Sequence, residues 1–339
     1  MMTRRSGLAA VLALAATFAL SACGSGGGGG EASKSAAPPR EIVFSILSAE
    51  NQASMEPLWT PLINDMSAAT GVHVRPFFAS NYTALIEAMR ADQVQVGWFS
   101  ALPALQAVER ANADVVGRIV DAGGDATYRS VLIVRRGSGI TLDQVLACGR
   151  RHSFGIGDAQ STSGTLAPMT YLFAPRSISP SECFSVVRSA SHQANFFAVA
   201  NGVVDIATNN SVGMVFAARE NPELARNVEV IWQSPPLPES SIVVRRDVDP
   251  ALRERIRQFF ITYGTAQGPE GDRQRRVLQG LAYGGFRAAD NTYLDPIRLM
   301  QATTALSEAR HGTDQAAIAR AQAAVDAVQR DIAAHGAHP

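Results

Sequence analysis

The sequence predicts an α/β protein built from two lobes with a cleft between them. Short apolar runs rich in β-branched residues alternate with segments of helical periodicity, which is typical of βαβ units around mostly parallel sheets. Two similar apolar runs, 130–136 and 241–246, are expected to carry the chain between the lobes. With 339 residues the chain is long enough for two domains, and its 46% apolar and 18% charged residues exclude a wholly disordered protein.

The first lobe is expected to be discontinuous. We assign residues 41–134 and 242–300 to it, and residues 135–241 to an inserted second lobe. The first lobe begins with alternating strands and helices at 42–47, 57–69, 72–78, 80–91, 94–99 and 102–111. The second is expected to have strands at 153–158, 184–189, 204–208 and 228–232, with helices at 165–173 and 194–201. The chain is helical again from Pro250, and residues 301–339 are expected to be C-terminal helices that pack on the body or mediate self-association.

Residues 1–22 are typical of a secretory signal peptide. Two arginines precede a short apolar run, which ends in a Leu-Ser-Ala-Cys motif at Cys23. This motif resembles the lipobox of bacterial lipoproteins, in which the cysteine thiol carries a diacylglycerol after cleavage. Residues 23–40 are rich in Gly, Ser and Ala and predict a flexible tether. We therefore expect a body anchored at the membrane surface through Cys23, and a soluble secreted protein is the alternative.

Two further cysteines, Cys148 and Cys183, follow the leader. An extracytoplasmic compartment permits a disulfide. Both cysteines flank strand-like runs, so their sulfurs can meet if those strands are neighbours. Because sequence does not supply the distance, a bridge and a pair of free buried thiols both remain open.

The loops that follow the strands are the expected place for a site, because ligands of open α/β sheets bind at the carboxyl ends of the strands. The loop 158–164 follows a strand, opens a helix and contains Ser161, Thr162 and Ser163. Free N–H groups and the positive end of a helix dipole at such a turn, together with three hydroxyls, suit a tetrahedral oxyanion. An ordinary Ser/Thr helix cap is the alternative interpretation. The loop lacks the Gly-Lys-Ser/Thr end of a nucleotide P-loop.

Three further side chains are candidates for the same site. His192 lies in a second turn between a strand and a helix, where its ring is able to donate to an anion. Tyr82 begins the helix after the second strand, and Tyr128 precedes the crossover run at 130–136. A phenol offers an apolar wall and one donor. Taken singly, each tyrosine is more typical of the core or the surface.

Composition and spacing exclude several partners. The net charge of the chain is zero, without the excess of basic residues that is usual for nucleic-acid binding. No nucleic acid is therefore expected as a partner. No cofactor motif is present, and no cofactor is expected. The histidines are scattered without metal-ligand spacing, so no metal site is expected; they are His73, His152, His192, His311, His335 and His338.

Several segments together resemble the phosphonate/phosphite-binding proteins of ABC importers, the PhnD family of periplasmic binding proteins. They are 154–158 leading into 161–164, then 191–195, 204–210 and 80–85, and the resemblance covers about residues 41–306. It implies a type II periplasmic-binding-protein clamp with two hinge strands, which closes on its ligand and presents a surface to the importer's membrane subunits. It also implies which residues hold the phosphorus-bound oxygens: Ser161, Thr162, Ser163, His192, Tyr82 and Tyr128.

Two positions depart from the family pattern. Members that bind 2-aminoethylphosphonate carry carboxylates where this chain has Val212 and, by our alignment, Ser240. Those carboxylates pair with the ligand's ammonium, and an unpaired buried charge is costly. Glu239 is one residue away from the second position, and it replaces the missing carboxylate only if its loop shifts. We therefore expect a ligand without an amino group, namely phosphite, a short alkylphosphonate or phosphate.

The expected function is that of a lipid-anchored, periplasmic substrate-binding protein of an ABC importer, held in contact with the membrane by its anchor and not an enzyme. A sensor subunit with the same pocket is one alternative, because the site alone does not separate transport from sensing. A secreted Ser/His hydrolase is another, but the chain lacks a Gly-x-Ser-x-Gly elbow and a Ser-x-x-Lys motif at this loop.

Overall fold

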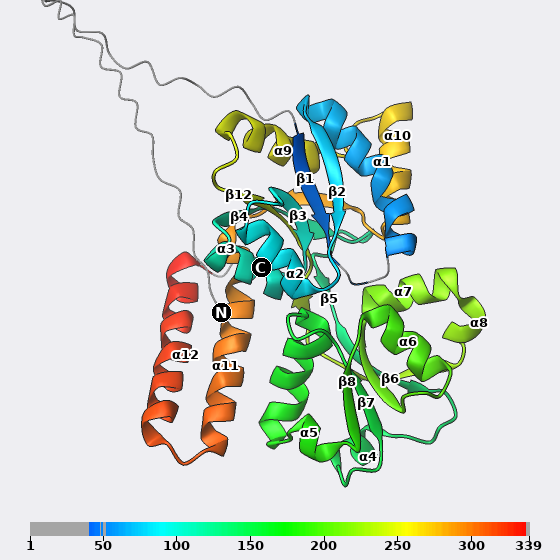
Figure 1. Ribbon diagram of the computed structural model, residues 1–339, viewed down its shortest axis with the longest axis vertical. Helices are drawn as coiled ribbons and strands as arrows, with labels where there is room; N and C mark the ends of the chain where they lie inside the picture. The colour runs from blue at the N-terminus through cyan, green and yellow to red at the C-terminus, as the bar shows by residue number, and fades with distance from the viewer. Residues whose placement is uncertain (1–40, 48, 50–51, 337–339) are drawn as a thin grey trace, which may run out of the picture. The chain divides into compact units, whose positions relative to one another are not determined.

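The computed structural model describes residues 41–47, 49 and 52–336 (Figure 1). The expected signal peptide, the lipidated Cys23 and the tether 23–40 lie outside the described residues. None of the helices in the described part of the chain combines the length and the apolar character that a membrane crossing requires.

The first lobe is built on a six-stranded mixed sheet with the order β13-β4-β12-β3-β1-β2. β1 pairs in parallel with β2 and β3, whereas β12 is antiparallel to β3 and β4, and β13 is antiparallel to β4. The strands are β1 (Glu41–Ile46), β2 (His73–Phe78), β3 (Val96–Phe99), β4 (Ala113–Val120), β12 (Ser241–Arg245) and β13 (Gly285–Ala288). The accompanying helices are α1 (Gln52–Thr70), α2 (Tyr82–Arg90), α3 (Ala101–Arg110), α9 (Pro250–Thr262), α10 (Pro269–Gly280) and the 3₁₀ turn η4 (Asn291–Leu294).

The second lobe is built on a five-stranded sheet with the order β10-β6-β9-β7-β8. Its strands are β6 (Ser130–Arg135), β7 (Ser153–Ile156), β8 (Val186–Ser189), β9 (Ile206–Asn210) and β10 (Val228–Gln233). Its helices are α4 (Leu142–Leu146), α5 (Pro180–Cys183), α6 (His192–Ala200), α7 (Ser211–Glu220) and α8 (Pro222–Ala225). The predicted helix 165–173 consists of two π-helical turns, η1 (Thr162–Leu166) and η2 (Met169–Phe173), followed by the 3₁₀ turn η3 (Ala174–Arg176).

The chain crosses between the lobes at two very short strands. β5 (Thr127–Tyr128) and β11 (Leu237–Pro238) pair antiparallel as a separate two-stranded sheet. Residues 130–134 were expected in the first lobe, but β6 pairs with β9 and β10 in the second sheet, so the expected boundary is wrong by one strand. The apolar patterns of β6 and β12 are alike, and only their pairing partners distinguish the lobes to which they belong.

Each lobe has its own apolar core. In the first lobe the fully buried Phe44 and Trp59 lie with ring centroids 5.5 Å apart, and Trp98 lies 5.2 Å from Trp59. In the second lobe Phe154 and Phe184 stack at 4.4 Å. The expected strand 184–189 begins only at Val186, because Phe184 terminates α5. β4 and β13 were not predicted from the sequence.

The C-terminal segment forms a hairpin of two helices, α11 (Asp295–His311) and α12 (Gln315–His335), which lie side by side in Figure 1. α11 contacts both lobes. Its buried Ile297 and Met300 join the first core, while the Thr304 hydroxyl lies 2.7 Å from that of Thr170 in the second lobe. The Ser307 hydroxyl adds a bond to the carbonyl of Ala174 at 3.0 Å. α11 therefore packs on the body of this chain and links the two lobes.

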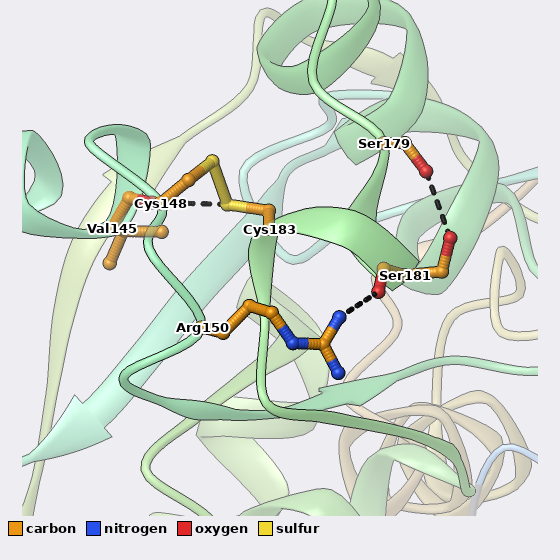
Figure 2. Close-up of a disulfide and its surroundings, with 6 residues drawn as sticks. All are labelled: Val145, Cys148, Arg150, Ser179, Ser181 and Cys183. Atoms are coloured by element: carbon orange, nitrogen blue, oxygen red, sulfur yellow. Dashed lines mark hydrogen bonds between the residues drawn. A yellow bond between two sulfur atoms is a disulfide. The ribbon is translucent and has the colours of Figure 1, made fainter.

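A disulfide joins Cys148 and Cys183, whose Cα atoms are 4.5 Å apart (Figure 2). The expected neighbours do pair, because β7 and β8 run parallel in register. Next to the bridge the Arg150 guanidinium donates to the carbonyl of Ser181 at 3.0 Å. The bridge therefore fixes the segment after α4 to the end of α5, at one edge of the second sheet.

Replacing both cysteines by alanine is expected to lower the free energy of unfolding by about 3–4 kcal/mol. The bridge spans 35 residues, and removing a cross-link of that length returns loop entropy to the unfolded chain. Urea denaturation of the ligand-free protein measures the change. Arg150→Ala, which removes the guanidinium's hydrogen bonds to the carbonyls of Ser181 and Ser185 but keeps the bridge, is the control and should cost less than about 1.5 kcal/mol. Free thiols in the unreduced wild-type protein would contradict the bridge.

Candidate ligand-binding site

A pocket lies where the two lobes meet the crossover strands. The first lobe contributes residues at and beyond the carboxyl ends of β1 and β3, including Leu47, Trp98 and Ser100. The second lobe and the crossovers supply most of the polar groups. The remaining described lining residues are Ala49, Met55, Tyr82, Tyr128, Ser163, His192, Asn210, Val212, Gly213, Phe216, Glu239, Ser240 and Tyr283.

The hydroxyl-bearing turn after β7 depends on two glycines in backbone contact. The N–H of Gly157 donates to the carbonyl of Gly164 at 3.0 Å. A Cβ atom on Gly157 would lie 2.5 Å from the Cα of Gly164, and one on Gly164 would lie 3.2 Å from Cε1 of His192. No side chain fits at either position without displacing the turn. The close approach brings the start of η1 next to the start of α6.

The three consecutive hydroxyls of this turn have different surroundings. Ser163 lines the pocket. Ser161 is the N-cap of η1, where its Oγ accepts from the N–H of Gly164 at 2.9 Å. Thr162 faces the first lobe, where its Oγ1 accepts from the N–H of Leu102 at 2.8 Å. Of the three, Ser163 alone is among the described lining residues.

His192 is the first residue of α6 and contacts the hydroxyl turn. Its Nε2 lies 3.3 Å from Oγ of Ser163 and 3.4 Å from Oγ of Ser161. Its backbone carbonyl accepts from Nδ2 of Asn209 at 2.9 Å. Nδ1 is buried and has no hydrogen-bond partner within the described residues. Burial lowers the pKa of His192 to about 4, so the ring is neutral at pH 7.

The two predicted tyrosines line the pocket from different elements. Tyr82 begins α2, whose N-cap Asn81 accepts from the N–H of Ala84 at 2.8 Å. Tyr128 lies on β5, and burial followed by the charge of Glu239 raises the pKa of its phenol. A neutral phenol offers one O–H donor. The structure therefore brings Tyr82, Tyr128, Ser163 and His192 together around one pocket.

Several lining residues were missed by sequence reasoning. Trp98 and Ser100 lie at the carboxyl end of β3, where the strand-end rule already pointed. The indole Nε1 of Trp98 is buried and has no partner in the part of the chain that the structure describes. Asn210 ends β9, and its Oδ1 caps α7 through the N–H of Gly213 at 2.8 Å. Tyr283 follows α10 and carried no signal in the sequence.

The pocket contains the carboxyl group of Glu239. This residue stands at neither of the two positions where relatives that bind 2-aminoethylphosphonate were expected to carry carboxylates. Val212 and Ser240 line the pocket, and so does Glu239, which is 7% exposed. Oε1 of Glu239 accepts from the backbone N–H of Ser240 at 2.7 Å. Burial, followed by the smaller effect of Asp121, raises the pKa of Glu239, although the Ser240 amide opposes the rise. None of the described lining residues is a lysine or an arginine.

The arrangement favours binding over hydrolysis. Ser163 and His192 are adjacent, but His192 lacks the carboxylate that orients the base of a hydrolytic triad, since Nδ1 has no partner among the described residues. No group of three acidic, histidine or cysteine side chains in the described ranges is placed to hold a metal ion. Hydroxyl, phenol and imidazole groups instead converge on one volume, which suits an acceptor-rich anion.

The neutral, buried His192 should make stability depend on pH. Unfolding exposes the ring and restores a pKa of about 6.5, whereas the folded value is about 4. The unfolded state therefore binds an extra proton between these values, and stability falls as the pH drops through the window. Between pH 7 and pH 4 the wild-type protein should lose about 3 kcal/mol more than His192→Gln. Urea denaturation across this range measures the difference, and parallel pH profiles would contradict a buried neutral ring.

Comparison with known proteins identifies the family. A family model for the phosphonate-binding periplasmic substrate-binding protein of ABC transporters matches residues 44–294. The phosphonates-binding periplasmic protein of Escherichia coli (strain K12) is 40% identical over 256 residues, which are 75% of this chain and 74% of that protein.

Solved structures agree with this fold. A binding protein component of an ABC phosphonate transporter from Pseudomonas aeruginosa is 33% identical with a TM-score of 0.83, covering 87% of this chain and 98% of that one. PhnD1 from Prochlorococcus marinus (MIT 9301), in complex with methylphosphonate, is 18% identical with a TM-score of 0.69, over 77% of this chain and 97% of that one. The latter likeness shows the fold alone. The chain therefore belongs to the periplasmic substrate-binding proteins of ABC phosphonate transporters, which are transport components and not enzymes.

Proposed function

We propose that this chain binds a small phosphorus oxyanion and delivers it to the membrane subunits of its importer. The proposed ligand is phosphite or a short alkylphosphonate, which it binds in preference to phosphate. The pocket between the lobes carries the proposal, because Ser163, His192, Tyr82 and Tyr128 all line it. A tetrahedral oxyanion presents several acceptor oxygens in a compact volume. Hydroxyl, phenol and imidazole donors satisfy such oxygens without bringing a fixed cation into the pocket.

The ligand's apolar end has complementary surroundings. Met55, Trp98, Val212 and Phe216 line the same pocket as the polar groups. A methyl or short alkyl group attached to phosphorus fits such surfaces, whereas phosphate places a fourth polar oxygen against them. The mixed lining supports a preference for phosphonates over phosphate.

The anchor is the second part of the proposal. The motif that ends at Cys23 and the glycine-rich stretch 23–40 support a diacylglycerol anchor followed by a tether. Held in this way, the binding protein stays close to the membrane subunits and meets them at a high effective concentration.

A ligand panel tests the proposal. Isothermal titration calorimetry should show that methylphosphonate and phosphite bind at least as tightly as phosphate and 2-aminoethylphosphonate. Ser163→Ala should weaken methylphosphonate binding about tenfold, because a hydroxyl donor to a charged oxygen is lost. Ser138→Ala, a hydroxyl on an exposed turn of the second lobe, is the matched control and should bind as the wild type does. Absence of binding to any phosphorus oxyanion would overturn the assignment.

Glu239 favours a second candidate ligand, an aminoalkylphosphonate. The carboxyl group lies in the pocket and forms no ion pair with any described residue. An ammonium group on the ligand would supply the missing partner from the position next to Ser240, so that the loop compensates for the two absent family carboxylates.

Glu239→Gln separates the two candidates. If the ligand's ammonium pairs with this carboxylate, the substitution should weaken 2-aminoethylphosphonate at least tenfold while changing methylphosphonate less than about twofold, because a neutral amide cannot compensate the charge. Calorimetry on the two ligands with both proteins measures the ratio. Equal effects on both ligands would exclude the ammonium partner and leave the first candidate.

A further inference from the structure

We propose that Thr162 is a positioning residue that holds the clamp closed, by capping a helix of the opposite lobe in place of that helix's own cap. The resemblance to the PhnD family implies that its hydroxyl binds the ligand; in the structure this hydroxyl contacts the opposite lobe. The described partners of this hydroxyl are the backbone of Leu102, the side chain of Ser100 and the phenol of Tyr128.

The start of α3 lacks its usual side-chain cap. Ser100 is the N-cap residue, yet its side chain makes no capping hydrogen bond within the helix. An N-cap side chain normally accepts from the N–H of the second or third helical residue. Here the N–H of Leu102, the second residue of α3, donates to Oγ1 of Thr162 at 2.8 Å. The Thr162 hydroxyl in turn donates to Oγ of Ser100 at 3.3 Å.

A second contact of the same kind lies at the start of α2. Oδ2 of Asp158 accepts from the backbone N–H of Tyr82, the first residue of the helix, at 3.3 Å. Oδ1 of Asp158 is held by the N–H of Gln160 at 2.8 Å. A carboxylate is favourable at this end of a helix, where free N–H groups and the helix dipole leave partial positive charge. One turn of the second lobe thus accepts first-turn N–H groups from two helices of the first lobe, although α2 also keeps its own cap, Asn81.

Burial makes the Thr162 contact energetically relevant. Thr162 is 0% exposed and Ser100 is 7% exposed. Separation of the lobes would leave the Leu102 N–H without its partner and expose both hydroxyls to water. Closure therefore gains stability from these bonds before any ligand contact is counted. Because apparent affinity is the intrinsic affinity scaled by the population of the binding-competent state, this contact should set ligand affinity from outside the pocket lining.

Two adjacent residues of η1 have different proposed roles, one in contact with the ligand and the other in closure of the lobes. Ser163 lines the pocket, while Thr162 contacts the first lobe. Removing Ser163's hydroxyl should alter contacts with the ligand, and removing Thr162's should alter closure. The two neighbouring substitutions therefore form a matched pair.

The experiment compares Thr162→Val, Thr162→Ser and Ser163→Ala in the full mature chain. Thr162→Val preserves the side-chain shape but removes the hydroxyl, whereas Thr162→Ser keeps it. Calorimetry with methylphosphonate, phosphite and phosphate measures affinity. Amide hydrogen exchange of the segment that contains Leu102, without ligand, measures closure directly. Circular dichroism melting excludes variants that fail to fold; if Thr162→Val does, Thr162→Ala, which removes the same hydroxyl from the bond to the Leu102 N–H, is the substitute.

Thr162→Val is expected to weaken every ligand by the same factor, about five- to tenfold, and to speed exchange at Leu102 in the ligand-free protein. Thr162→Ser should restore both. Ser163→Ala should weaken binding without changing ligand-free exchange at Leu102. Unequal losses among the ligands, or unchanged exchange in Thr162→Val, would overturn the proposal.

The inference rests on the proposed function only for its choice of ligands. If the wild-type protein bound none of them, the proposed function would fail, while exchange in the ligand-free variants would still test whether Thr162 closes the clamp.

Discussion

The backbone contact between Gly157 and Gly164 is the constraint on which the site depends. With no room for a Cβ atom on either residue, the chain leaves β7, turns sharply and enters η1 with its hydroxyls beside the start of α6. His192 reaches Ser161 and Ser163 only because this turn is so tight. A larger residue at either glycine would separate the imidazole from the hydroxyls, and the polar wall of the pocket would be lost.

The electrostatics of the pocket follow from burial. His192 is kept neutral, and the phenol of Tyr128 is kept protonated, so both present dipoles in place of fixed charges. Such groups favour an acceptor-rich ligand through the direction of their hydrogen bonds and not through a net charge. Glu239 is the exception, because its carboxyl group brings a titratable acid into a lining whose described residues include no lysine or arginine. The charge state of this one group therefore changes the electrostatic potential inside the pocket.

The contacts that hold the lobes together come from elements far apart in sequence. The turn after β7 reaches the starts of α2 and α3, and α11 contacts both lobes through Thr304 and its buried apolar side chains. The crossovers themselves are only the short pair of β5 and β11. With crossovers this short, interlobe contacts of this kind are available to stabilise the proposed closed form. These contacts lie next to the residues that line the pocket, so the proposed closure would act on the same volume as the proposed ligand.

The sequence by itself determined the α/β class, the order of most strands and helices, and the family, since periodicity and local motifs are properties of contiguous residues. It also singled out Ser163 and His192, which lie in short segments after strands. Tertiary structure decided that β6 belongs to the second sheet, that Thr162 faces α3 and that Glu239 enters the pocket. These outcomes depend on strand pairing and on which face of a turn meets another lobe. Residues distant in the chain set both, and no local pattern encodes them.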